Sequence, residues 1–230
     1  MKKFDRYFSE FVYGAIDGTV TTFATVAAAA GAGFDASIVI ILGFANLIAD
    51  GFSMAVSSYL SAKSSQEVYE RERNKVKKAL GNARKEQSLI KKIFGKYKLS
   101  EATLNEISEK IQDNEEYFID VVMKEEKEMY KSNESPFAIG AATYLAFVVV
   151  GLMPLLIYLI DALFNLELAV KTLFIWSASL SVVSFAAIGL LKGYVTQQKQ
   201  KRSVIETLLL GIFAAIVAYL LGFYLEKLLV

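Results

Sequence analysis

The chain has no cysteine, no histidine and only two prolines among its 230 residues. The missing cysteine excludes disulfides and thiolate nucleophiles, and the missing histidine excludes imidazole bases and the usual zinc ligand sets. Any metal ion must therefore be held by oxygen, amide or thioether groups. An excess of charge of one sign is also missing, because 25 Lys and Arg residues face 24 Asp and Glu residues. We therefore expect no nucleic-acid partner.

Long apolar runs dominate the rest of the chain, which is 54% hydrophobic. Runs of about 20 residues match the roughly 30 Å of hydrocarbon in a bilayer at 1.5 Å per helical residue. Pro154 lies inside one run and should kink its helix. The sequence therefore predicts an all-α polytopic membrane protein with five transmembrane helices, embedded in the lipid bilayer, at residues 11–33, 36–59, 137–160, 170–191 and 204–225.

Most of the charges lie in one segment, from Lys63 to Glu134. There they alternate with spaced apolar residues in helical rhythm, which predicts a helical insert outside the membrane between the second and third helices. We expect three parts: transmembrane helices 1 and 2 in residues 1–65, the insert in residues 66–135, and transmembrane helices 3 to 5 in residues 136–230.

Basic residues also predict the orientation of the chain. They precede the first span, fill the insert and join the last two spans, at Lys192, Lys199, Lys201 and Arg202. The positive-inside rule then places the N-terminus and the insert in the cytoplasm and the C-terminus outside. Because no targeting extension precedes the first span, we expect the protein in the cell membrane of a prokaryote, crossing it several times.

The second predicted span carries Asn46, Asp50 and Met54 at intervals of four, which places them on one stripe of a helix. An Asp at the centre of a membrane helix costs roughly 2.5–3.5 kcal/mol, so it is seldom there without a partner or a task. The thioether of Met54 suits soft divalent ions such as ferrous iron and, less well, manganese, rather than sodium, magnesium or calcium. The alternative is that Met54 only fills space between helices.

The first predicted span carries Asp17, with Thr21 one turn further on and Gly14 and Gly18 on either side of the acid. Two carboxylates close together repel one another unless a cation or a proton lies between them. If Asp17 approaches Asp50 across the two helices, the pair suits an exchange of metal ions for protons. The alternative is that Asp17 hydrogen-bonds a neighbour while the glycines permit close helix packing.

Three segments of the chain have a specific pattern: DGTVTTFATVAAAAGAG, NLIADGFSMAVSSYLSAKS and LLKGYVTQQKQKRSVIETLLLG. They resemble the vacuolar iron transporter family, and the position of the insert fits the same family. What the resemblance implies is a homodimeric five-helix transporter, without a prosthetic group, that moves Fe²⁺ and often Mn²⁺ out of the cytoplasm in exchange for protons. It aligns Asp17 with the acid of the family's first helix and Met54 with the methionine of its second.

The chain departs from the plant members of that family at Asn46, where those relatives have a glutamate. One carboxylate of the pathway is therefore missing, and Asp50, one turn along, is the candidate to supply it. The resemblance thus makes Asp50 the residue on which an exchange mechanism most depends.

A second departure lies in the insert, which in plant members loads metal through glutamate clusters and a Met-Met-x-x-Glu run. Here Lys75-Val76-Lys77-Lys78 takes the place of the first cluster, and Glu86 alone matches the second. The last helix keeps Met123 and Glu126 but has Val122 for the first methionine. Because lysines oppose cation binding, we expect a weak, altered or lost metal site.

Two further candidate ligands in the insert are Glu67 and Glu70. The alternative is that they and the neighbouring glutamates form a solvated face that pairs with lysines at helical spacing. These residues therefore do not decide by themselves whether the insert binds metal.

Three functions remain open at this stage. The first is a proton-coupled exporter of ferrous iron or manganese. The second is a membrane-tethered iron-oxidising protein, although that chemistry normally uses Glu-x-x-His pairs and this chain has no histidine. The third is a non-transporting membrane sensor or scaffold whose insert recruits partners.

Overall fold

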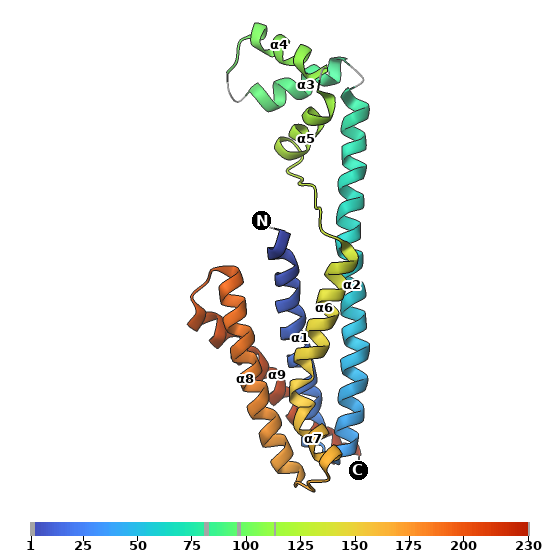
Figure 1. Cartoon of the computed structure of the whole chain (residues 1–230), viewed down its shortest axis with the longest axis vertical. Helices are drawn as coiled ribbons and strands as arrows, with labels where there is room; N and C mark the ends of the chain where they lie inside the picture. Colours follow the sequence, from blue (N-terminus) through green and yellow to red (C-terminus); the bar gives the residue numbers. More distant parts are fainter. Residues whose placement is uncertain (1–2, 81–82, 96–97, 113, 230) are drawn as a thin grey trace. The chain divides into compact units, whose positions relative to one another are not determined.

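The computed structural model describes residues 3–80, 83–95, 98–112 and 114–229, and all the regular structure within them is helical (Figure 1). This confirms the all-α prediction. The helices, in chain order, are α1 (Lys3–Gly31), α2 (Ala36–Leu80), α3 (Ala83–Phe94), α4 (Glu101–Gln112), α5 (Glu115–Glu125), α6 (Pro136–Gly151), the short 3₁₀ helix η2 (Met153–Leu155), α7 (Leu156–Phe164), α8 (Val170–Thr196) and α9 (Gln200–Leu229).

The chain forms two compact units. One contains residues 1–60 and 134–230, and we call it the helix bundle. The other contains residues 61–133, and we call it the insert. The long helix α2 begins in the bundle and ends in the insert. The three-part division at 65/66 and 135/136 stays a prediction.

Four helical stretches in the described part of the chain are long and apolar enough to cross a membrane: 36–80, 136–164, 170–196 and 200–229. This confirms a multi-pass membrane protein. Helix α1 does not belong to this set, because charged residues at its start and Asp17 in its middle lower its hydropathy. A count of five spans therefore remains a prediction.

Glycines bring α1 close to α6. A Cβ atom added at Gly14 would lie 2.5 Å from the carbonyl oxygen of Thr143, and one added at Gly18 would meet the backbone of Phe147. Small residues at such positions let two helix backbones approach, which gives dispersion contacts that lipid cannot replace. Because rising numbers on α1 meet rising numbers on α6, the two helices run in the same direction.

Helix α2 packs against α6 in the opposite direction. Gly140 of α6 lies against the carbonyl of Ala55 of α2, and further along α2 Gly43 lies against the side chain of Leu155 in η2. The hydroxyl of Thr143 on α6 donates to Ser58 Oγ on α2 at 3.3 Å. Small residues and a hydroxyl pair therefore hold α2 to its neighbour.

The third apolar stretch is interrupted at Pro154, as its sequence predicts. Helix α6 begins at Pro136, where Ser135 Oγ accepts a hydrogen bond from the amide of Ala138, and it ends at Gly151. Residues Met153–Leu155 then form η2 before α7 begins. A proline inside a helix has no amide hydrogen to donate and its ring clashes with the preceding turn, so the break follows from the residue itself.

The insert has a hydrophobic core of its own, built from the second half of α2 and from α3 to α5. Helix α5 supplies Phe118, Ile119, Val122 and Met123, each 3% exposed or less. These four positions share one face of the helix, while the charged residues of α5 lie on the other. The insert is therefore held together by apolar burial in the same way as a soluble helical domain.

Candidate metal pathway

The predicted stripe lies on the bundle part of α2. Asn46 and Met54 are partly buried there, whereas Asp50 is exposed. The Nδ2 atom of Asn46 is buried and has no hydrogen-bond partner among the described residues. This NH2 group is a hydrogen-bond donor without an acceptor among these residues, whereas a metal cation would bind the amide oxygen of the same side chain.

Asp17 is partly buried on α1 and interacts electrostatically with Asp50 on α2. The interaction is repulsive when both carboxyls are ionised, and repulsion in a low-dielectric bundle is relieved by a cation or a proton. The two helices thus bring together one acid each, in an arrangement that favours binding of a positive charge.

Thr21 uses its hydroxyl on its own helix, where it donates to the backbone carbonyl oxygen of Asp17 at 2.9 Å. Thr19 and Thr25 make the same bond to the carbonyl four residues earlier. The lone pairs of Thr21 Oγ1 remain available to a cation, but its proton is engaged. Thr21 can therefore contribute an oxygen ligand without donating to the Asp17 carboxylate.

One copy of the chain offers a limited set of ligands. Within the described residues no three Asp or Glu side chains come together in a group that would hold a metal ion. The stripe and α1 supply two carboxylates, one amide and one thioether. Ferrous iron and manganese accept such a mixed set, but their preferred coordination numbers leave room for further oxygen ligands.

The polar surface of α2 extends beyond the predicted stripe. Ser53 and Ser57 are exposed and follow Asp50 at intervals of three and four, so the three side chains share one face. In a membrane-spanning helix a carboxylate and two hydroxyls on an uncovered face are unfavourable. This face therefore needs a polar neighbour.

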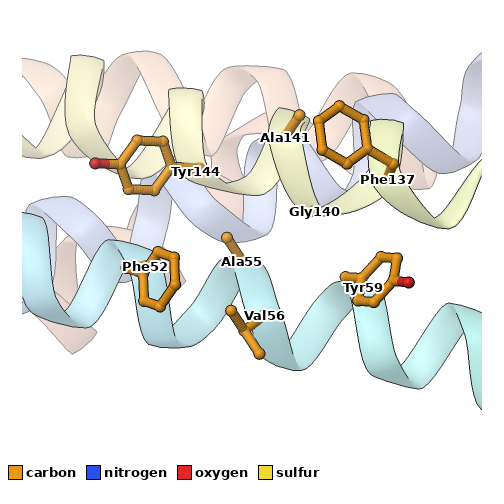
Figure 2. A pocket seen from close by; sticks show the side chains of 8 residues that line it. All are labelled: Phe52, Ala55, Val56, Tyr59, Phe137, Gly140, Ala141 and Tyr144. Atoms are coloured by element: carbon orange, nitrogen blue, oxygen red, sulfur yellow. The ribbon is translucent and has the colours of Figure 1, made fainter.

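A groove of about 380 Å³ lies on a different side of α2, where α2 meets α6 (Figure 2). Figure 2 shows that the hydroxyls of Tyr59 and Tyr144 point away from one another at its two ends. The rest of its lining is apolar, and none of the five predicted pathway residues belongs to it. The groove is therefore an apolar recess that lies apart from the candidate ion path.

In the insert, the structure places most of the predicted ligands against lysines or in the core. Glu126 forms an ion pair with Lys92, and Glu67 lies 3.9 Å from Lys63. Met123 is fully buried. Glu70 is exposed, and the side chain of Glu86 lies outside the described residues.

A further ion-pair cluster centres on Glu116, which binds both Arg73 and Lys77 from α2. The hydrogen bond from Lys77, followed by that from Arg73, lowers the pKa of the Glu116 carboxyl below its ordinary value of 4.5. Lysine and arginine side chains of the chain itself therefore neutralise carboxylates around α5 that a metal ion would otherwise bind.

Two buried hydroxyls in the bundle were not singled out from the sequence. Tyr158 on α7 is fully buried, as is Thr22 on α1, and neither hydroxyl has a hydrogen-bond partner among the described residues. Tyr158 could have been found in the sequence, because it follows the proline of a broken membrane helix by four residues. Nothing in the sequence distinguishes Thr22 from its neighbours, whose hydroxyls bond their own helix.

Long apolar helices that pack closely through glycines define a multi-pass membrane protein. The chain belongs to the VIT family, whose model matches residues 8–223. It is similar to a protein named vacuolar iron transporter from Plasmodium falciparum (isolate 3D7), with 28% identity over 94% of this chain and 81% of the relative. It is also similar to vacuolar iron transporter 1 from Tulipa gesneriana, with 29% identity over 91% of this chain and 83% of the relative.

The family assignment confirms the resemblance inferred from the three sequence segments. Because it is a family of transporters, it also confirms that the chain is a transporter and not an enzyme. A third relative, named vacuolar iron transporter, from Toxoplasma gondii (strain ATCC 50861 / VEG), is 29% identical over 96% of this chain and 74% of its own length.

Proposed function

We propose that the chain exports ferrous iron, and manganese as a second substrate, from the cytoplasm in exchange for protons. The observation that carries this proposal is the electrostatic interaction between Asp17 of α1 and Asp50 of α2, with Asn46 one turn before Asp50 on the same helix. Two interacting acids bind either a divalent cation or protons, so each species displaces the other. Met54 favours a softer ion over magnesium or calcium. The names of the relatives support iron as the cargo.

In this proposal α1 also crosses the membrane, which brings the number of spans to five. Its parallel packing against α6, itself part of an apolar span, supports this assignment. The charges that lower its hydropathy lie at its cytoplasmic end, apart from Asp17 at the proposed ion site. The N-terminus and the insert are then cytoplasmic, the C-terminus is outside, and the protein functions in the cell membrane.

The proposed transporter is a homodimer. The face of α2 that carries Asp50, Ser53 and Ser57 is exposed in one copy, although it lies on a span that is otherwise apolar. The small residues of α1, in contrast, are used within one copy against α6. A second copy that covers the polar face of α2 would remove it from lipid and supply the oxygen ligands that one copy lacks.

Disulfide trapping tests the homodimer directly, because the natural chain has no cysteine. We expect Ser57→Cys to give a disulfide-linked dimer in membranes under mild oxidation. The matched control is Leu209→Cys on α9, which is also exposed but lies on an apolar face. Efficient cross-linking of the control with none at position 57 would contradict the proposed interface.

The proposed role of the insert is structural rather than metal-loading. Support comes from the ion pairs of Glu126 with Lys92 and of Glu116 with Arg73 and Lys77, and from the burial of Met123. Metal transport by the bundle should then not depend on glutamates of the insert.

The transport proposal is tested with purified protein in proteoliposomes that contain a metal-sensitive dye and a pH-sensitive dye. We expect Fe²⁺ or Mn²⁺ uptake to be accompanied by proton movement in the opposite direction. Asp50→Asn should lower metal uptake at subsaturating metal by at least about tenfold, the scale on which weakened ligand shells lose affinity.

The matched control is Asp35→Asn, which removes one exposed carboxylate from the loop before α2. Asn is an equally good residue at a helix start, so this change should leave α2 intact. Unchanged uptake in both Asp50→Asn and Asp17→Asn would overturn the proposed site. Uptake of metal without any proton movement would overturn the coupling alone.

A further inference from the structure

A buried apolar cluster closes the part of the bundle around η2 and α7. Its members come from five elements, so it ties together most of the helices that surround the candidate path. All are 3% exposed or less: Val26 and Ala29 of α1, Val39 of α2, Leu155 of η2, Tyr158 of α7 and Leu173 of α8.

The cluster is continuous with the polar stripe of α2. Val39 precedes Asn46 by seven residues, which is two helical turns or about 10 Å, so the two side chains lie on the same face. In the orientation of the proposed function, on which this inference rests, Val39 lies between the stripe and the outer surface. An ion that leaves the stripe outward meets this apolar cluster.

Tyr158 is the unusual member of the cluster. Its side chain is fully buried among apolar residues, and its hydroxyl has no partner among the described residues. A buried hydroxyl without a hydrogen bond loses its hydration and receives nothing in return. A phenylalanine would fill the same space without that cost. The hydroxyl is therefore more favourable in a second arrangement in which it reaches water or an ion.

The segment before Tyr158 is suited to such a rearrangement. Helix η2 breaks the span at Pro154, and α7 begins directly after it. One hydrogen bond ties the break to the next span, because the Ser177 hydroxyl of α8 donates to the Pro154 carbonyl oxygen at 2.5 Å. Broken helices in transporters are tolerated where neighbouring groups satisfy the freed backbone. They often form the substrate site around which one part of the transporter moves against another.

The α1 side of the break carries a second hydroxyl without a partner. Helix α1 contacts η2, and the backbones of Gly18 and Gly151 touch just before the break. Thr22 lies one turn beyond Gly18, fully buried, with its hydroxyl unbonded. Two unsatisfied hydroxyls therefore lie on elements that meet at the break.

We propose that α7 is the outer gate of the transporter, that η2 is its hinge and that the Ser177–Pro154 hydrogen bond is its latch. The structure corresponds to the closed gate, in which Tyr158 and Val39 block the outward end of the stripe. Opening breaks the latch, turns α7 away from α1 and brings the Tyr158 hydroxyl into contact with water.

The test uses the absence of natural cysteine to place a single reporter, Val39→Cys. The rate of its modification by a membrane-impermeant methanethiosulfonate reagent, added from the outer side, measures how often the gate opens. Adding Ser177→Ala should raise the rate about three- to tenfold, the effect of losing one hydrogen bond of the closed state. The control Ser179→Ala, whose hydroxyl bonds its own helix on an exposed face, should leave the rate unchanged.

Tyr158→Phe should act in the opposite direction, because it removes the unsatisfied hydroxyl of the closed state. We expect slower modification of the reporter and slower metal release, with metal affinity at the stripe unchanged. A residue that is only structural would change neither rate. If Val39→Cys does not fold, Leu173→Cys on α8 is a second reporter in the same cluster.

Modification rates that do not respond to Ser177→Ala or to Tyr158→Phe, in protein that still transports metal, would overturn the gate. The modification assay needs no metal. A response of the reporter in protein that transports neither iron nor manganese in proteoliposomes would therefore retain the gate and overturn the proposed substrate.

Discussion

Met123 provides the clearest separation between a metal ligand and a core residue in the insert. The resemblance to the family aligns it with a metal-loading motif, but its side chain is fully buried against α5 neighbours and the second half of α2. We predict that Met123→Leu, which keeps the volume and removes the sulfur, costs less than about 1.5 kcal/mol of local stability. Met123→Ala should cost about 2–5 kcal/mol, because it leaves a cavity in a packed core.

The measurement is amide hydrogen exchange of the full chain in detergent, read for α5 (Glu115–Glu125). If its most protected amides exchange by opening of the insert, a loss of 2–5 kcal/mol raises their exchange rates by about 30- to 4,000-fold, since 1.4 kcal/mol corresponds to a factor of ten. Met123→Leu should raise them by no more than about tenfold.

Metal uptake by the same variants completes the test. Both variants should bind metal at the bundle with unchanged affinity. A Met123→Leu protein that keeps its exchange protection yet loses metal binding or uptake would refute the assignment to the core, because only the thioether has changed. The surface substitution Lys124→Leu, at the adjacent exposed position, controls for an added leucine on α5.

Two other predictions concern the ion pairs and the glycines. Because Lys77 and Arg73 lower the pKa of Glu116, the ion pairs of Glu116 contribute fully to stability above the ordinary pKa of 4.5, and this contribution is lost as pH falls through the lower pKa of the folded state. Glu116→Gln should therefore weaken the pH dependence of amide exchange protection in the insert at acid pH. The exposed control Glu115→Gln should leave that pH dependence unchanged. Gly14→Val should lower the free energy of unfolding of the detergent-solubilised protein, measured by thermal denaturation, by about 1–3 kcal/mol, because the new Cβ would meet a backbone oxygen. Gly95→Ala should be neutral, because the space around Gly95 is open.

Features that depend on a short window could be predicted from the sequence. The helical fold follows from apolar runs of membrane length and from the scarcity of proline, and the break in the third apolar stretch follows from Pro154 itself. The burial of Met123 is also readable, because Phe118, Ile119, Val122 and Met123 share one helical face. The family motif drew attention to its sulfur instead.

Features that depend on residues far apart in the chain could not be predicted from the sequence. Glu116 is 43 residues from Arg73 and 39 from Lys77, so helical spacing gives no sign of the cluster. The exposure of Asp50 depends on which face of α2 meets α6, and that face is chosen by glycines on both helices. The isolation of the Tyr158 hydroxyl depends on neighbours from four other elements. Local pattern carries none of this information.

The two acids also constrain the stoichiometry of exchange. In the proposed site, the carboxylates of Asp17 and Asp50 would bring two negative charges per copy of the chain into a bundle where an unpaired charge is costly. One divalent ion neutralises them, and so do two protons, whereas one proton leaves a net charge in the membrane. The proposed exchange is therefore electroneutral, one metal ion for two protons.

The rate of metal uptake in proteoliposomes should not respond to an imposed potassium diffusion potential, while it should follow the pH gradient. Asp50→Asn leaves one carboxylate and one titratable proton, so any residual metal uptake should move net charge and become sensitive to that potential. Potential-dependent uptake by the unaltered protein would contradict a site built on two carboxylates.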